Sequence, residues 1–211
     1  MTANGRKLTD QGRERRQQLL DAAGRLFAER GYANTRIIDI CDAAGVAKGL
    51  FYWYFENKEA LFVDLVRAMR LRLRQAQARA IDPAADPLTR IRQGAEASVL
   101  FMAEHNAFFS VLEVESSDST VLALRREGNQ VHAADTAALI VEAQTCGQLR
   151  EDTDVALATL GVNAAVAHFS HFHRSGQIDV PVAELARFVA DWVVRALAGE
   201  VPALAWSTEA R

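Results

Sequence analysis

The chain has 211 residues, half of them hydrophobic and 24% charged, and its 24 Lys and Arg against 27 Asp and Glu give a net charge of −3. This apolar content excludes a disordered or low-complexity chain, because it is enough to form a buried core. The two cysteines give neither a disulfide framework nor a paired metal motif, which is typical of a protein from a reducing cytoplasm. A net charge near zero argues, at first sight, against a nucleic-acid ligand.

The charge is unevenly distributed along the chain. Residues 1–80 contain 15 Lys and Arg against 9 Asp and Glu, whereas residues 81–211 contain 9 against 18. Such an asymmetry is typical of a small basic module joined to an acidic body, although uneven surface charge alone would also produce it.

The polarity of the N-terminus and the length of the apolar runs indicate where in the cell the protein is expected. The opening MTANGRKLTDQGRERR is too polar for a signal peptide, and no apolar run approaches the roughly 18 residues of a membrane span. We therefore expect a cytoplasmic protein with no membrane partner.

Nearly every periodic segment has the helical period, which predicts an all-α fold of about nine helices. Gly31 ends the first helix. A short helix then starts at Thr35 or Arg36, with Thr35 as its expected N-cap, and stops at Gly45. A third short helix covers about 47–54, and a long one begins at Lys58. The apolar stripe of the first helix consists of Leu19, Leu20, Ala23, Leu26 and Phe27.

Helices also dominate the acidic body. Asp86 is the expected N-cap of a helix that begins with Pro87. Further helical segments cover about 107–115, 120–146, 153–173 and 181–198. The last is apolar over more than half of its circumference, so we predict that it is covered on two sides, by its own domain and by a partner.

The spacing over residues 37–54 is that of a helix-turn-helix unit, whose second helix lies in the DNA major groove. Gly45 supplies the turn conformation, and Val46 is the expected apolar plug. Phe51 and Phe55, four residues apart, are expected to pack inward. The residues left on the exposed side are Lys48, Gly49, Tyr52, Trp53 and Tyr54. Exposing these aromatic side chains to water is unfavourable, but they suit contact with DNA phosphates and base edges.

An ordered set of residues between about 15 and 62 extends this motif. It consists of Gly31-Tyr32, Thr35, Ile37, Ile40, Ala44-Gly45-Val46, Lys48-Gly49, Phe51-Tyr52, Tyr54-Phe55 and Lys58-Glu59-Ala60-Leu61. In these residues the chain resembles the TetR family of bacterial transcriptional regulators. The resemblance implies a homodimer with a DNA-binding domain over 1–60, including a flexible basic arm over about 1–12. It also implies an effector-binding and dimerisation domain over 61–211, with a linking helix at about 58–80.

The family's DNA contacts carry over by matching position. They fall on Thr35, Arg36, Lys48, Gly49, Leu50, Tyr52, Trp53, Tyr54 and Lys58. Leu50 and Trp53 are apolar, so we expect them to contact thymine methyl groups or sugars. Ala47 departs from the pattern, in which Ser or Thr is usual. The basic residues near the N-terminus either contact the DNA backbone or minor groove or form a solvated tail, and they are Arg6, Lys7, Arg13, Arg15 and Arg16.

The body contains apolar walls with a few polar groups, which are typical of a small-molecule pocket and of a helical core alike. The candidate contacts to an effector, expected to be apolar or aromatic, are Phe101, Met102, His105, Phe109, Glu113, Asn163 and His168. The family's last two helices commonly pair across the dimer. The candidate dimer contacts are therefore His171, Phe172, Phe188, Trp192, Val193 and Leu197.

His168 and His171 are near enough on one helix to share a metal, but spacing supplies no third ligand. We expect no metal and no cofactor, and the absence of catalytic motifs predicts that the chain is not an enzyme. The expected function is a homodimeric repressor that binds a palindromic double-stranded DNA operator and is released by a small-molecule effector. Alternatives are an effector-independent architectural DNA-binding protein of the same fold, or a helical metal-binding protein built on these histidines.

Overall fold

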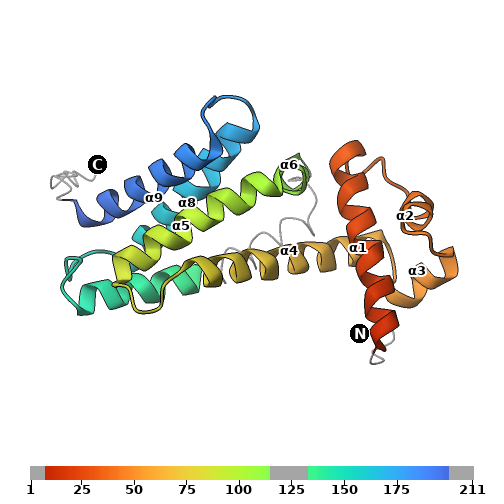
Figure 1. Ribbon diagram of the computed structural model, residues 1–211, viewed down its shortest axis with the longest axis horizontal. Helices are drawn as coiled ribbons and strands as arrows, with labels where there is room; N and C mark the ends of the chain where they lie inside the picture. Colours follow the sequence, from red (N-terminus) through yellow and green to blue (C-terminus); the bar gives the residue numbers. More distant parts are fainter. Residues whose placement is uncertain (1–7, 115–132, 200–211) are drawn as a thin grey trace, which may run out of the picture. The chain divides into compact units, whose positions relative to one another are not determined.

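The computed structural model describes residues 8–114 and 133–199, which form α-helices joined by turns (Figure 1). The chain divides into two compact units. Unit 1 comprises Met1–Ala76 and Phe101–Val131, and unit 2 comprises Gln77–Leu100 and His132–Arg211. The predicted all-helical fold is confirmed, and each unit combines stretches that are distant in the sequence.

Unit 1 contains α1 (Asp10–Arg30), α2 (Ile37–Ala44), α3 (Lys48–Tyr54), most of α4 (Lys58–Ala80), the end of α5 (Pro87–Glu104) and α6 (Asn106–Val114). Local signals fix the helix ends. The Thr9 hydroxyl caps α1 by accepting from the Gly12 backbone N–H at 3.2 Å. Gly31 ends the helix, and its N–H donates to the Phe27 carbonyl at 2.9 Å. Gly45 ends α2 in the left-handed region at φ 63° and ψ 36°, as the turn prediction required.

Thr35 does not cap α2, so that prediction is wrong. The N-cap is Arg36, whose backbone N–H donates to Asp39 Oδ2 at 3.0 Å. The Thr35 hydroxyl is directed backward and donates to the Gly31 carbonyl at 2.8 Å, so it belongs to the end of α1. This position buries Thr35 completely.

The core of unit 1 is rich in aromatic rings. Phe27 of α1 and Phe62 of α4 meet edge to face with centroids 5.7 Å apart, and Tyr32 lies 5.0 Å from Phe62. Ile40 and Cys41 of α2 are fully buried in the same cluster, and Val46 packs against it as a partly buried plug. Burial raises the pKa of the Cys41 thiol, as expected for a small core residue.

Unit 2 contains the end of α4, most of α5, a helical segment over 133–145, α8 (Val155–Arg174) and α9 (Val182–Ala198). Asp154 caps α8 by accepting from the Leu157 N–H at 3.0 Å. Arg92 of α5 is paired with Asp191 of α9 at 2.7 Å, which ties these two helices together. The buried face of α9 consists of Leu185, Ala186, Val189, Ala190 and Val193.

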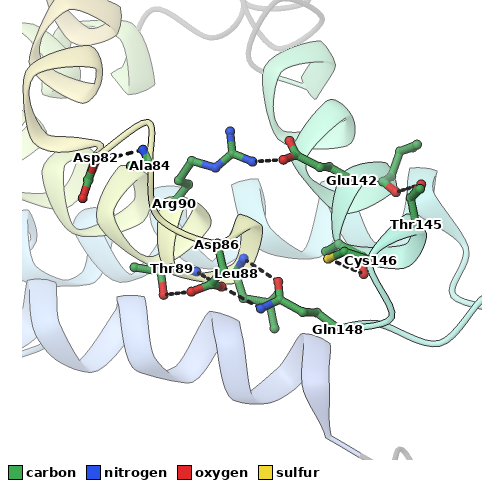
Figure 2. A network of polar contacts seen from close by, with 12 residues as sticks. Asp82, Ala84, Asp86, Leu88, Thr89, Arg90, Glu142, Thr145, Cys146 and Gln148 are labelled. Carbon is green, nitrogen blue, oxygen red and sulfur yellow. Dashed lines mark hydrogen bonds and ion pairs between the residues drawn. The ribbon is translucent and has the colours of Figure 1, made fainter.

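A polar network joins the start of α5 to the end of segment 133–145 (Figure 2). Asp86 accepts from the Thr89 backbone N–H at 3.0 Å and from the Thr89 hydroxyl at 2.6 Å, which confirms the predicted cap before Pro87. Gln148 donates to the same carboxylate at 2.8 Å. Hydrogen bonds from Thr89 and Gln148 hold the pKa of Asp86 at about 2. Beside them, Arg90 is paired with Glu142.

Candidate functional site

The short helix α3 has one buried and one exposed side. Phe51 and Phe55 are buried, with ring centroids 5.7 Å apart, as their four-residue spacing predicted. Lys48, Gly49, Tyr52 and Trp53 are exposed. Tyr52 and Trp53 keep 46% and 42% of their surfaces open to water, which is a large aromatic exposure for a helix of two turns.

The two other predicted contacts on α3 are less accessible. Tyr54 was expected on the exposed side, yet it is only 5% exposed, because its ring packs between Trp53, at a centroid distance of 4.8 Å, and Phe55. Leu50 is partly buried against the core of unit 1. The accessible part of α3 is therefore narrower than the helical wheel predicted.

Arg36 remains accessible at the start of α2, with 76% of its side chain exposed. Its guanidinium donates to both Asp39 oxygens, at 3.0 and 2.8 Å. Hydrogen bonding from Arg36 lowers the pKa of Asp39 to about 2. An anion at Arg36 therefore competes with an adjacent carboxylate that is ionised at neutral pH.

Thr35 and Lys58 lie together beneath the start of α2. The Lys58 ammonium donates to the Tyr32 carbonyl at 2.7 Å and to the Thr35 carbonyl at 2.9 Å, and it lies 4.2 Å from the centre of the Tyr32 ring. These contacts join the α1–α2 loop to the first turn of α4. In this arrangement, Thr35 and Lys58 position α2 and α3.

An open groove of about 530 Å³ lies between the first turns of α1 and one side of α3. Four residues from the start of α1 line one wall: Thr9, Gln11, Gly12 and Arg15. Four residues of α3 line the other wall: Gly49, Leu50, Trp53 and Tyr54. Sequence reasoning did not identify Gln11 or Gly12, because no periodic pattern shows that the start of α1 lies beside α3.

The basic residues predicted to form an N-terminal arm lie in different surroundings. Arg6 and Lys7 lie outside the described residues, whereas Arg13, Arg15 and Arg16 belong to α1. Arg13 is paired with Asp10 and donates to the Leu8 carbonyl at 2.9 Å. Arg16 is paired with Asp64, and its guanidinium carbon lies 5.2 Å from the centre of the Phe55 ring.

The predicted effector contacts are divided between the two units. Phe101, Met102, His105 and Phe109 belong to unit 1, where the Phe101 ring lies 4.2 Å from the His105 ring and 6.4 Å from the Phe109 ring. Burial lowers the pKa of His105, which favours a neutral imidazole.

Asn163 and His168 belong to unit 2. Asn163 accepts from the Thr136 hydroxyl at 3.4 Å, and His168 is exposed, with Nδ1 3.0 Å from the Ala164 carbonyl oxygen. The side chain of Glu113 lies outside the described residues. A shared pocket for the seven predicted effector contacts stays a prediction.

Helices α8 and α9 present an apolar face. Phe188 and Trp192 are 54% and 45% exposed, and both pack edge to face on Phe169 of α8. Phe172 is exposed, while His171 and Leu197 are partly exposed. Val193 is 1% exposed and lies in the core of unit 2, so it is not available as the predicted dimer contact.

Helix α8 also exposes two leucines that the sequence analysis did not identify. Leu157 and Leu160 of α8 are 67% and 61% exposed, and they follow the helical spacing that leads to Ala164 and His168. By length and composition α8 could cross a membrane, with a mean hydropathy of 1.3 over 18 residues. The expectation that no segment approaches a membrane span was therefore too strict. The signal that sequence reasoning missed is that α8 is apolar on two opposite sides.

The histidines of α8 have separate local contacts. His168 lies against the Ala164 carbonyl, and His173 Nε2 lies 3.1 Å from the Val180 carbonyl oxygen. Across residues 8–114 and 133–199, no three His, Cys, Asp or Glu side chains are close enough to hold a metal ion. The described geometry therefore gives the metal-binding alternative no support.

Comparisons with known proteins bear on the helix-turn-helix region first. The family described as "Bacterial regulatory proteins, tetR family" matches residues 19–65. The HTH-type transcriptional regulator AcrR of Shigella flexneri is 42% identical over 60 residues, which are 28% of each chain. The HTH-type transcriptional repressor KstR2 of Mycobacterium tuberculosis is 37% identical over 101 residues, or 48% of each chain. The chain thus matches less than half the length of these curated relatives.

Solved structures extend the likeness to the whole fold. The fatty acid degradation regulator FadR of Bacillus halodurans has a TM-score of 0.79 and 21% identity, covering 91% of this chain and 98% of that chain. The ketosteroid transcriptional regulator KstR2 of M. tuberculosis has a TM-score of 0.66 and 24% identity, covering 88% and 96%. These relatives are regulators of transcription, not enzymes. Residues 19–65, from α1 to the first half of α4, thus match the TetR family of bacterial regulatory proteins, and the solved structures share the helical fold of the chain.

Proposed function

We propose that this chain is a homodimeric transcriptional repressor that binds a palindromic DNA operator through α3 and leaves it when a small molecule binds. The observation that carries the proposal is the exposed side of α3. It places the cation Lys48 beside the exposed rings of Tyr52 and Trp53, on a helix that Phe51 and Phe55 anchor in the core. A short cationic and aromatic helix after a tight glycine turn is suited to the major groove.

The contacts to DNA divide by chemistry. Lys48 and Arg36 are the accessible cations for phosphate, and Tyr52 supplies a hydroxyl donor. Trp53 offers an apolar edge for sugars and thymine methyl groups. Three other side chains hold α2 and α3 in position, because their polar groups or rings make contacts within unit 1. They are Thr35, Tyr54 and Lys58.

A second copy of the chain is the proposed partner of the apolar face on α8 and α9. Leu157, Leu160, Phe188 and Trp192 together expose more apolar surface than a helix pair keeps in water without a partner. A twofold interface uses the same face of both copies. It places two α3 helices in one assembly, which matches a palindromic operator.

The proposed effector is apolar or aromatic. The names of two structural neighbours refer to fatty acid degradation and to ketosteroids, which are largely apolar compounds. In unit 1 the rings of Phe101, His105 and Phe109 form an aromatic cluster, with His105 favoured in its neutral form. The effector releases DNA if it binds the DNA-incompetent arrangement of the dimer more tightly than the competent one.

The test is a salt titration of DNA binding by fluorescence anisotropy. Genomic fragments selected on the purified protein supply the operator, and a scrambled duplex of equal length supplies the control. We expect tighter binding to the operator and an affinity that falls steeply with salt. Lys48→Ala is expected to lower the salt slope by about one, whereas Arg150→Ala, which removes an exposed charge in unit 2, leaves the slope unchanged. Equal affinity for both duplexes would favour the architectural alternative.

A further inference from the structure

The groove between α1 and α3 is the feature of unit 1 that the helix-turn-helix motif leaves unexplained. It adjoins the exposed side of α3, since Gly49 and Trp53 belong to both surfaces. Its opposite wall comes from the first turns of α1, which lie outside the α2–α3 motif. The groove therefore continues the surface proposed to face DNA onto a second element.

Of the three arginines near the start of α1, only Arg15 lines this groove. Arg13 and Arg16 are each paired with a carboxylate, those of Asp10 and Asp64. Within the described part of the chain, the contact of Arg15 is a hydrogen bond from Nη1 to the neutral Gln18 side-chain oxygen at 3.0 Å. Arg15 therefore presents a positive charge to the groove without a carboxylate partner among the described residues.

The other wall of the groove is apolar and open. Trp53 is 42% exposed, and an added Cβ at Gly49 would meet no atom within 4 Å. An indole beside a guanidinium, across an open groove, matches a sugar–phosphate strand, which alternates an apolar ring edge with an anion. Arg is also the side chain best suited to bind phosphate through two parallel hydrogen bonds.

We propose that this groove holds one sugar–phosphate strand of the duplex, with Arg15 bound to a phosphate and Trp53 packed on the adjoining deoxyribose. The inference rests on the proposed DNA-binding function and extends it to a second element. Unit 1 then grips the backbone from α1 while α3 reads the neighbouring base pairs. Arg15 thereby adds one phosphate contact to those made by α2 and α3.

The experiment compares Arg15→Ala with Arg25→Ala in the full chain, by anisotropy on one labelled duplex over a series of KCl concentrations. Arg25 is an exposed cation of the same helix that does not line the groove. One lost phosphate contact lowers the slope of log K against log salt by about 0.9. We expect this loss for Arg15→Ala, no change for Arg25→Ala, and recovery of the slope in Arg15→Lys. Trp53→Ala is expected to weaken binding at every salt concentration with the slope unchanged, because the indole has no charge.

The outcomes separate this inference from the proposed function. If the unaltered protein binds no duplex, the proposed function fails and the groove proposal fails with it. If the unaltered protein binds and Arg15→Ala keeps its full slope, the groove proposal alone is wrong. Weaker binding of inorganic polyphosphate by Arg15→Ala, with duplex binding unaltered, would show that the groove holds a different anion and would likewise overturn it. Unchanged thermal melting of each variant excludes unfolding as the cause.

Discussion

The Lys58 ammonium lies against two carbonyl oxygens and an aromatic ring, all from the loop between α1 and α2. Family resemblance assigned this lysine to phosphate, and its contacts show what else the charge does. Two charge-assisted hydrogen bonds in a half-buried position stabilise the loop that sets the start of α2. A lysine at the beginning of α4 is therefore a structural link within unit 1, whatever it contacts in DNA.

Lys58→Ala is predicted to destabilise the chain. Removing two hydrogen bonds to a charged donor costs roughly 1.5–3 kcal/mol in the free energy of unfolding. Urea denaturation should show a lower midpoint with an unchanged slope. Lys48→Ala is the matched control, because Lys48 is exposed on α3, and its free energy of unfolding should stay within about 0.5 kcal/mol of the original. A Lys58→Ala midpoint equal to that of the control would contradict the structural role.

Burial at single residues was the hardest property to predict. The four-residue spacing of Phe51 and Phe55 identified two core residues correctly. Tyr54 was misplaced, because a helix of seven residues has no face wide enough to separate buried from exposed positions without knowledge of α1. The role of Thr35 was predicted wrongly, because its hydroxyl can either cap α2 or donate to the end of α1. The path of the chain after Gly31 decides between these two, and it favours the bond to the Gly31 carbonyl.

At the scale of elements, caps and glycines predicted helix ends well. Gly31 and Gly45 each stand at the C-terminal cap of a helix, as the sequence indicated. The apolar face of α8 was not predicted, because hydrophobic periodicity shows that a face is apolar and not what covers it. A helix with two apolar faces has the same pattern whether the second meets its own domain, a second copy or lipid.

Gly45→Ala tests the turn of the helix-turn-helix unit. An added methyl group would meet no atom within 4 Å, so the cost is the left-handed backbone conformation at φ +63° alone. That conformation costs a non-glycine residue about 1–2 kcal/mol. Gly49→Ala is the control, because Gly49 lies inside α3 with equally open surroundings, and alanine there should stabilise by up to about 1 kcal/mol. In urea denaturation, we expect the free energy of unfolding to fall in Gly45→Ala and to rise in Gly49→Ala. A change of the same sign in both variants would contradict this prediction.

The cap at Asp86 predicts an acid-sensitive element in unit 2. Its pKa is about 2 in the folded chain against an ordinary value of 3.8, because Thr89 and Gln148 donate to it. A folded pKa below the unfolded one gives stability that is present above about pH 4 and is lost as the pH falls toward 2. Asp86→Asn keeps an oxygen for capping and cannot titrate. The fall in unfolding free energy from pH 5 to pH 2.5 should therefore be smaller in this variant than in Asp179→Asn, which removes a carboxylate elsewhere in unit 2.

At the scale of the whole molecule, the apolar face on α8 and α9 determines the oligomeric state that we propose. Burying one exposed leucine in the interface contributes about 1.5–3 kcal/mol to the free energy of dimerisation. Because the interface is twofold symmetric, the same leucine of both copies contributes. The charge asymmetry fits the same arrangement. In the proposed complex with DNA, the basic first 80 residues approach phosphate, while the acidic remainder disfavours DNA on other surfaces.

Leu160→Glu is predicted to convert the dimer to a monomer at micromolar concentration. A carboxylate on each copy would be buried without a partner at the interface, which is strongly unfavourable. Leu71→Glu is the control, because Leu71 on α4 is 58% exposed and lies in unit 1. Sedimentation equilibrium should give twice the chain mass for the control and the single chain mass for Leu160→Glu. A dimeric Leu160→Glu variant would show that another surface holds the copies together.

The core of unit 1 is completed by residues from the middle of the chain. Phe101, Phe108 and Val111 belong to the same buried cluster as the residues of α1 to α4. During synthesis, the segment through residue 80 is therefore made before the side chains that cover its apolar surface. At about 5–20 residues per second, the 31 residues from 80 to 111 take roughly 2–6 s to add. Over that interval, helices α1 to α4 expose the apolar surface that Phe101, Phe108 and Val111 later cover.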